Sequence, residues 1–118
     1  MNFEKLDEIL GLEDAIHYVG IMDSMGNIIT NKIKKGITTE HDEEMYRMDL
    51  LIIKNMLDIY NPSFGKTLTV QTVREKITQL VFYHDYMIIY IACDPTVDKN
   101  TMLKISNKAG ELIKELMH

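Results

Sequence analysis

The spacing of apolar residues changes several times along this chain, and the order of these changes limits the fold that it can adopt. The elements expected are a helix over Phe3 to Leu10, strands over Ile16 to Met22 and Ile28 to Ile33, a helix over about Glu40 to Tyr60, strands over Leu68 to Val73, Ile77 to Tyr83 and Met87 to Cys93, and a C-terminal helix. This α-β-β-α-β-β-β-α order predicts an α/β (α+β) fold with a single five-stranded antiparallel sheet flanked by helices. A chain of 118 residues fits one domain, over residues 1–118.

Turn sequences separate these elements. The stretch Asp23-Ser24-Met25-Gly26 is typical of a hairpin turn, and Asn61-Pro62 is expected to end the long helix. Asn2 and Gly11 are placed to cap the first helix. Short turns at 74–76 and 84–85 join the last three strands into a meander. The strands at 16–22 and 87–93 are apolar on both faces, so we expect them inside the sheet. The stripe expected to pack the last helix on the sheet is Met102, Ile105, Ala109, Leu112 and Leu116.

The long helix is apolar over more of its surface than one sheet face can cover. At about 100° per residue, one arc holds Met45, Met48, Ile52, Met56 and Ile59, and the next holds Tyr46, Leu50, Ile53, Leu57 and Tyr60. Together they cover about 200°, whereas packing on a sheet needs little more than ~100°. The simplest hypothesis is that a second copy of the chain buries the excess apolar surface of this helix. The alternative is that the first helix and the loops bury it. Asp49 lies inside this arc and needs a partner or a water-filled gap.

Composition restricts the class of protein. The net charge is -5 and no basic stripe is present, which disfavours nucleic-acid binding. Apolar runs are far shorter than the ~20 residues of a membrane span, and the N-terminus lacks the pattern of a signal peptide, so we expect a cytoplasmic protein without a membrane span. Plentiful isoleucine and lysine with little alanine are typical of an AT-rich prokaryotic or archaeal genome.

No catalytic or metal-binding pattern is found. Phe64-Gly65-Lys66-Thr67 matches the end of a phosphate loop, but Tyr60 stands where the first glycine is required and a strand follows where a helix should begin. The four histidines show no paired-ligand spacing, and Cys93 is the only cysteine. We therefore expect no catalytic residues, no metal and no cofactor.

The chain resembles the Roadblock/dynein-light-chain family, whose fold is related to profilin and longin domains. The resemblance rests on residues 12–30 with the Asp23-x-x-Gly26 turn, the long helix, the meander that ends in Asp94-Pro95, and the terminal helix. It implies a non-catalytic homodimer in which the long helix and the following strand meet their counterparts, and a small Ras-like GTPase as a candidate partner. The dimer interface expected from it comprises Met45, Met48, Asp49, Ile52, Ile53, Met56, Leu57, Tyr60, Leu68 and Val70.

The function expected is thus a non-enzymatic, homodimeric regulatory or scaffolding module that binds a small GTPase or another protein. Asp49 is expected to pair with a cation across the dimer seam. The alternative is a cytosolic sensor that holds a small apolar ligand between helices and sheet, with His17, Tyr18 or Tyr90 as polar contacts.

Overall fold

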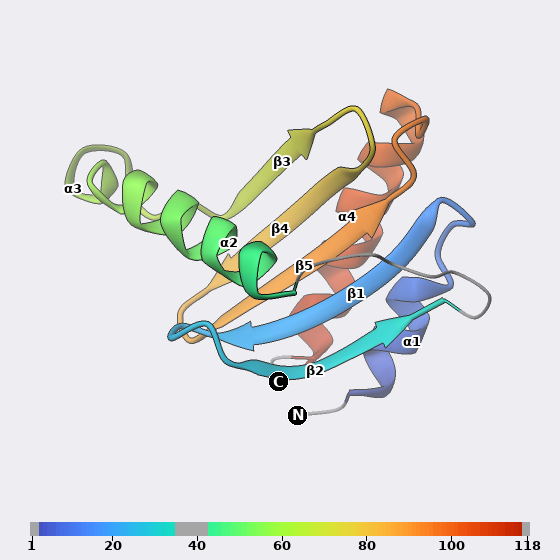
Figure 1. The fold of residues 1–118 in the computed structure, drawn as a ribbon, viewed down its shortest axis with the longest axis horizontal. Coiled ribbons are helices and arrows are strands. Elements are labelled where there is room, and N and C mark those ends of the chain that lie inside the picture. Colours follow the sequence, from blue (N-terminus) through green and yellow to red (C-terminus); the bar gives the residue numbers. More distant parts are fainter. Residues whose placement is uncertain (1–2, 35–42, 117–118) are drawn as a thin grey trace.

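The computed structural model describes the backbone of residues 3–34 and 43–116, and the side chains of all of these except 43–47. Figure 1 shows one sheet with helices on both faces. The elements are α1 (Glu4–Leu10), β1 (Ile16–Asp23), β2 (Ile28–Ile33), α2 (Glu43–Asp58), α3 (Asn61–Phe64), β3 (Thr69–Val73), β4 (Thr78–His84), β5 (Met87–Cys93) and α4 (Lys99–Leu116). This confirms the predicted fold class, and α3 is the one element that the sequence pattern did not indicate.

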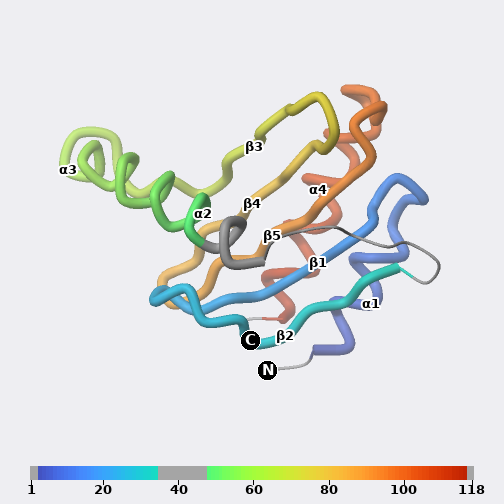
Figure 2. The backbone as a smooth tube through the Cα atoms, viewed as in Figure 1, coloured from blue at the N-terminus to red at the C-terminus, as the bar shows by residue number. Residues whose placement is uncertain are grey.

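All neighbouring strands in the sheet are antiparallel, in the order β2-β1-β5-β4-β3. β1 and β5 lie inside the sheet, as their apolar character on both faces predicts. α1 and α4 pack on one face, and α2 crosses the other face, so that its C-terminal end and α3 extend past the strands in Figures 1 and 2. The sheet therefore has one face that carries two helices and one face that carries a single long helix.

Side chains of β1 and β5 alternate between two apolar cores. The core under α1 and α4 includes Val19, Ile21, Ile89 and Ile91. The core under α2 is smaller, and its buried members are Tyr18, Met22, Leu50, Val81, Ile88, Tyr90 and Ala92. Thus α2 covers a core to which the strands contribute most of the buried side chains.

Several boundaries differ from the predicted ones. α1 begins at Glu4 and not at Phe3, and Asn2 lies outside the described residues, as does the start of the long helix predicted before residue 43. Gly11 ends α1 as expected. In α4, Ile113 is buried where Leu112 was expected, and Leu112 packs on the core only in part. Among the described residues, no helix is both long and apolar enough to cross a membrane.

The chain after α2 forms a further helical turn, α3, where the sequence predicts only a break. Pro62 lies at the start of α3, and proline is tolerated there because the first N–H groups of a helix have no intrahelical acceptor. The backbone then leaves α3 at Gly65, whose φ of 79° favours glycine. Proline at this position therefore ends one helix and begins another.

Candidate functional site

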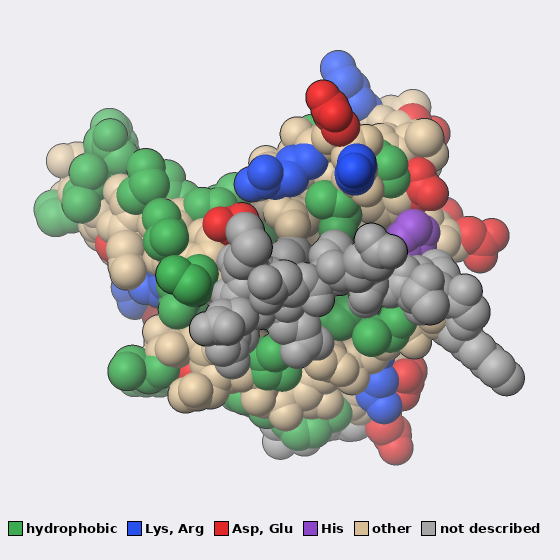
Figure 3. Space-filling view, viewed as in Figure 1, with side chains coloured by type: hydrophobic (Ala, Val, Ile, Leu, Met, Phe, Trp, Pro, Cys, Tyr) green, Lys and Arg blue, Asp and Glu red, His purple; other side chains and the backbone are tan. Residues whose placement is uncertain are grey.

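The outer face of α2 carries exposed apolar side chains at helical spacing. We call Met48, Ile52 and Met56 of α2, together with Ile59 directly after it, the α2 stripe; they are 55%, 51%, 65% and 71% exposed. Leu50, on the opposite side of the helix, is buried against the sheet. Figure 3 shows hydrophobic side chains gathered along α2 and α3. The excess apolar arc expected from the sequence is therefore open to solvent in the single chain.

The first helix does not cover this stripe, because α1 packs with α4 on the other face of the sheet. The apolar surface instead continues beyond α2. Tyr60, Phe64 and Leu68 are all more than half exposed, and the ring centroids of Tyr60 and Phe64 lie 6.2 Å apart. Leu68 leads directly into β3. Exposed apolar side chains thus follow α2 and α3, and Leu68 is exposed directly before β3.

β3 is the last strand of the sheet on this side, so no described strand pairs with its outer edge. Val70 and Thr72 lie on the α2 side of the sheet, opposite Val81 and Gln79 of β4, and both are half-buried. An edge strand with free backbone groups beside an apolar surface is suited to pairing with another chain.

The structure separates the predicted interface residues into three groups. Met48, Ile52, Met56, Tyr60 and Leu68 are exposed, as an interface in the free chain requires. Ile53, Leu57 and Val70 are half-buried. The side chain of Met45 lies outside the described residues. Two exposed residues of the same surface, Ile59 and Phe64, were not among the predicted interface residues. Ile59 already lay in the apolar arc, whereas the contribution of Phe64 depends on α3.

Asp49, the one charged residue among those predicted, already has a cation within the chain. Its Oδ2 lies 3.7 Å from Nη2 of Arg74, just beyond the end of β3, and both side chains are more than half exposed. This ion pair bridges α2 and the β3 edge. Arg74 of the same chain is near enough to balance the charge of Asp49. Pairing of Asp49 with a cation of a second copy stays a prediction.

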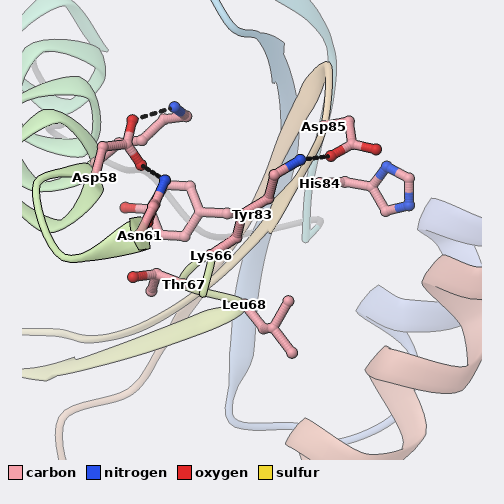
Figure 4. A pocket seen from close by; sticks show the side chains of 9 residues that line it. Asp58, Asn61, Lys66, Thr67, Leu68, Tyr83, His84 and Asp85 are labelled. Atoms are coloured by element: carbon pink, nitrogen blue, oxygen red, sulfur yellow. Dashed lines mark hydrogen bonds and ion pairs between the residues drawn. The ribbon is translucent and has the colours of Figure 1, made fainter. Parts of the chain in front are cut away.

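A polar cleft of about 260 Å³ lies beside the C-terminal end of α2 (Figure 4). On the helix side, Lys54 Nζ donates to Asp58 at 2.8 Å, and Asn61 Nδ2 donates to the same carboxylate at 3.4 Å. On the strand side, Lys66 Nζ donates to Asp85 at 2.8 Å. These hydrogen bonds lower the pKa of Asp58 and Asp85 and raise that of Lys66. Each carboxylate and each ammonium group thus has an opposite charge beside it.

Two further residues of this cleft, Tyr83 and Lys66, are engaged in contacts within the chain. Tyr83 lies between the two ion pairs, and burial raises its pKa to about 12, so the phenol stays neutral. Its hydroxyl donates to the carbonyl of Leu50 in α2 at 3.4 Å. Lys66, the lysine of the partial phosphate-loop pattern, is engaged with Asp85, and a strand follows it as predicted. Sequence spacing does not reveal this cleft, because its lining comes from α2, α3 and the strands, which are separate along the chain.

Of the residues named for an apolar ligand, Tyr18 and Tyr90 meet, whereas His17 lies apart from them. Tyr18 and Tyr90 stack with ring centroids 5.5 Å apart, and their hydroxyl groups lie 3.1 Å apart in the core under α2. His17 is half-exposed instead, with Nε2 3.9 Å from Asp94 Oδ2. The cleft described above lies elsewhere, and most of the residues that line it are charged or polar. Burial raises the pKa of Cys93 to about 11, which is typical of an inert core thiol.

Comparison with known proteins finds similarity to solved structures and none to a family model or a curated protein. Among solved structures, the gliding protein MglB from Thermus thermophilus superposes with a TM-score of 0.76 at 13% identity, over 92% of this chain and 82% of that one. An MglB structure with a tetrameric arrangement gives 0.76 at 14% identity, over 92% and 81%. The Roadblock/LC7 domain from Streptomyces avermitilis gives 0.68 at 8% identity, over 98% and 97%. The protein therefore has the Roadblock/LC7 fold.

Proposed function

We propose that the protein is a non-enzymatic regulatory or scaffolding module that acts as a homodimer joined through the α2 stripe and the β3 edge. The observation that carries this proposal is the exposed apolar surface formed by α2, α3 and Leu68. A soluble protein rarely exposes a continuous apolar surface of several hundred Å² unless another molecule covers it. The resemblance to Roadblock proteins supports an interface at this helix and strand.

The size of the surface fits a second copy. Seven large apolar side chains are more than half exposed there: Met48, Ile52, Met56, Ile59, Tyr60, Phe64 and Leu68. At about 200 Å² each when fully exposed, they offer roughly 900 Å², close to the ~800 Å² that each partner contributes to a standard interface. An antiparallel edge strand can also pair with its own copy about a two-fold axis. That an MglB structure is tetrameric supports association between copies of this fold.

Light scattering after size exclusion tests the dimer. We expect twice the mass of one chain at micromolar concentration. Ile52→Lys should weaken dimerisation at least about 100-fold, because it buries an unpaired charge in the seam. The matched control is Leu103→Lys on the outer side of α4, where the leucine is 62% exposed, and it should leave the mass unchanged. A mass of one chain at every concentration would rule out the homodimer.

Asp49 lies at the border of this seam and allows a second test. We expect Asp49→Arg and Arg74→Asp each to weaken the dimer, and the variant with both changes to regain it. An equimolar mixture of the two single variants then separates the two pairings. The mixture forms a tight heterodimer only if Asp49 meets Arg74 of the second copy. If neither single change alters the dissociation constant, Asp49 does not belong to the interface.

The partner that we propose for the dimer is a small Ras-like GTPase, on the resemblance to the Roadblock family. Titration of the purified dimer with purified Ras-like GTPases, loaded with GDP or with a non-hydrolysed GTP analogue, tests this role. We expect binding that depends on the nucleotide and no GTP hydrolysis by the protein alone. Hydrolysis that disappears in Lys66→Ala would contradict the non-enzymatic assignment.

A further inference from the structure

The described side chains of α2, residues 48–58, include fewer buried ones than those of α4, the other long helix. Within residues 48–58, the part of α2 whose side chains are described, only Leu50 is fully buried. α4 places five buried side chains on the opposite face over 18 residues, and α1 places two over 7. Most of the stability of a protein helix comes from packing of its apolar face. By the share of buried side chains, residues 48–58 of α2 are less firmly anchored than α1 or α4.

The other contacts of α2 with the sheet are weak or exposed. The hydrogen bond from Tyr83 to the carbonyl of Leu50 is 3.4 Å long, beyond the usual range. The ion pair between Asp49 and Arg74 spans 3.7 Å between side chains that are more than half exposed, and such pairs contribute little. Leu51 packs against the hairpin turn at Gly26 and is half-buried. None of these contacts replaces a packed apolar face.

The helix also lacks favourable charges at its C-terminal end. Its last turn holds Asp58 and no basic residue, although a helix C-terminus favours cations. Lys54 compensates for Asp58, but both belong to α2, so their pairing does not attach the helix to the sheet. In contrast, Lys114 lies in the last turn of α4. The contacts described within the chain thus hold α2 on the sheet only weakly.

We propose that a second copy supplies further contacts to α2, so that docking of α2 on the sheet and dimerisation form one linked equilibrium. This inference rests on the proposed homodimer. A second copy on the α2 stripe buries the outer face of the helix, which then packs on both sides. Because the partner binds the docked helix, dimerisation shifts the population towards docking. The core under α2, including the Tyr18–Tyr90 pair, is then protected in the dimer and opens more often in the separated chain.

Hydrogen exchange with mass spectrometry on the full chain tests this linkage, with light scattering on the same samples. Amides of residues 48–58 should exchange at least about 10-fold faster when dilution separates the dimer, or in Ile52→Lys, than in the concentrated wild type. Amides of residues 102–116 in α4 should keep their rates. Lysine has a higher helix propensity than isoleucine, so faster exchange in this variant does not come from the helix itself. Leu103→Lys is the control and should leave both segments unchanged.

The outcomes separate this inference from the proposed homodimer. If scattering shows the dimer dissociating while residues 48–58 keep their protection, the linkage is wrong and the dimer stands. If α4 loses protection together with α2, the chain opens as one unit and the linkage is also wrong. If the wild type has the mass of one chain at every concentration, both the proposed homodimer and the linkage fall. Selective loss of α2 protection on dissociation supports the inference.

Discussion

Gly20 is the position in the core under α2 where one added methyl group should have a large effect. It lies in β1 directly opposite Tyr90 of β5, and the phenol ring of Tyr90 occupies the space above it. A Cβ at this position would overlap Cζ and Oη of Tyr90 and would lie 2.6 Å from its Cε2. The ring cannot move away easily, because it is buried and stacked on Tyr18. Gly20→Ala should therefore overpack this core.

The expected cost follows from two opposing contributions. Overpacking a well-filled core costs about 1–3 kcal/mol, at the upper end here because the overlap involves several ring atoms. Alanine in place of glycine within a strand recovers roughly 0.5–1 kcal/mol of backbone entropy. We expect a net loss of about 2 kcal/mol, which corresponds to about 8 °C in Tm for a domain of this size.

Urea denaturation followed by circular dichroism measures this loss. A double-mutant cycle with Tyr90→Val identifies its cause, because valine removes the ring that the new methyl group meets. In the Tyr90→Val background, Gly20→Ala should instead stabilise the protein by roughly 0.5–1 kcal/mol, which gives a coupling energy of about 3 kcal/mol. Equal losses in both backgrounds would refute the argument, because the cost would then not come from the ring.

Three further predictions concern stability. Gly110→Ala in α4 should raise the free energy of unfolding by about 1 kcal/mol, since the new methyl group would lie 3.8 Å from Phe82 and glycine weakens a helix; an unchanged urea midpoint would contradict this. Asp98→Ala should lower it by about 1 kcal/mol, because the Asp98 carboxylate accepts from the backbone N–H of Thr101 at 2.6 Å at the start of α4, and Asp98→Asn should lose less. Hydrogen bonds from the turn at Asn27 hold the pKa of Asp23 below its usual value, so its contribution is present above the unfolded pKa of about 3.9 and is lost as the pH falls through the lower folded pKa. The urea midpoint of unfolding should therefore decrease as the pH falls below about 4, and it should decrease less steeply in Asp23→Asn. Equal slopes of the urea midpoint against pH in the two proteins would show that this carboxylate is not responsible.

The sequence by itself determined the order of the elements other than α3, and it placed β1 and β5 among the three strands inside the sheet. Both follow from local periodicity, because residues two apart share a face of a strand and residues three or four apart share a face of a helix. The same reasoning detected that the helix around Ile52 has more apolar surface than one sheet face can cover. A pattern of this kind shows that an excess exists, and Met48, Ile52, Met56 and Tyr60 of this segment are exposed in the structure.

Only the tertiary structure decided which side chains that are distant in the sequence come into contact. Arg74 reaches Asp49, Lys66 reaches Asp85 at a separation of 19 residues, and the hydroxyl groups of Tyr18 and Tyr90 meet at a separation of 72. No period of two or 3.6 residues encodes such pairs, because they depend on the order of the strands and on the direction in which α2 crosses them. The course of the chain after Asp58 was undetermined for the same reason, since proline can end a helix or begin one. Local spacing thus decides which residues share a face, whereas the packing of the sheet and α2 decides which face is left open.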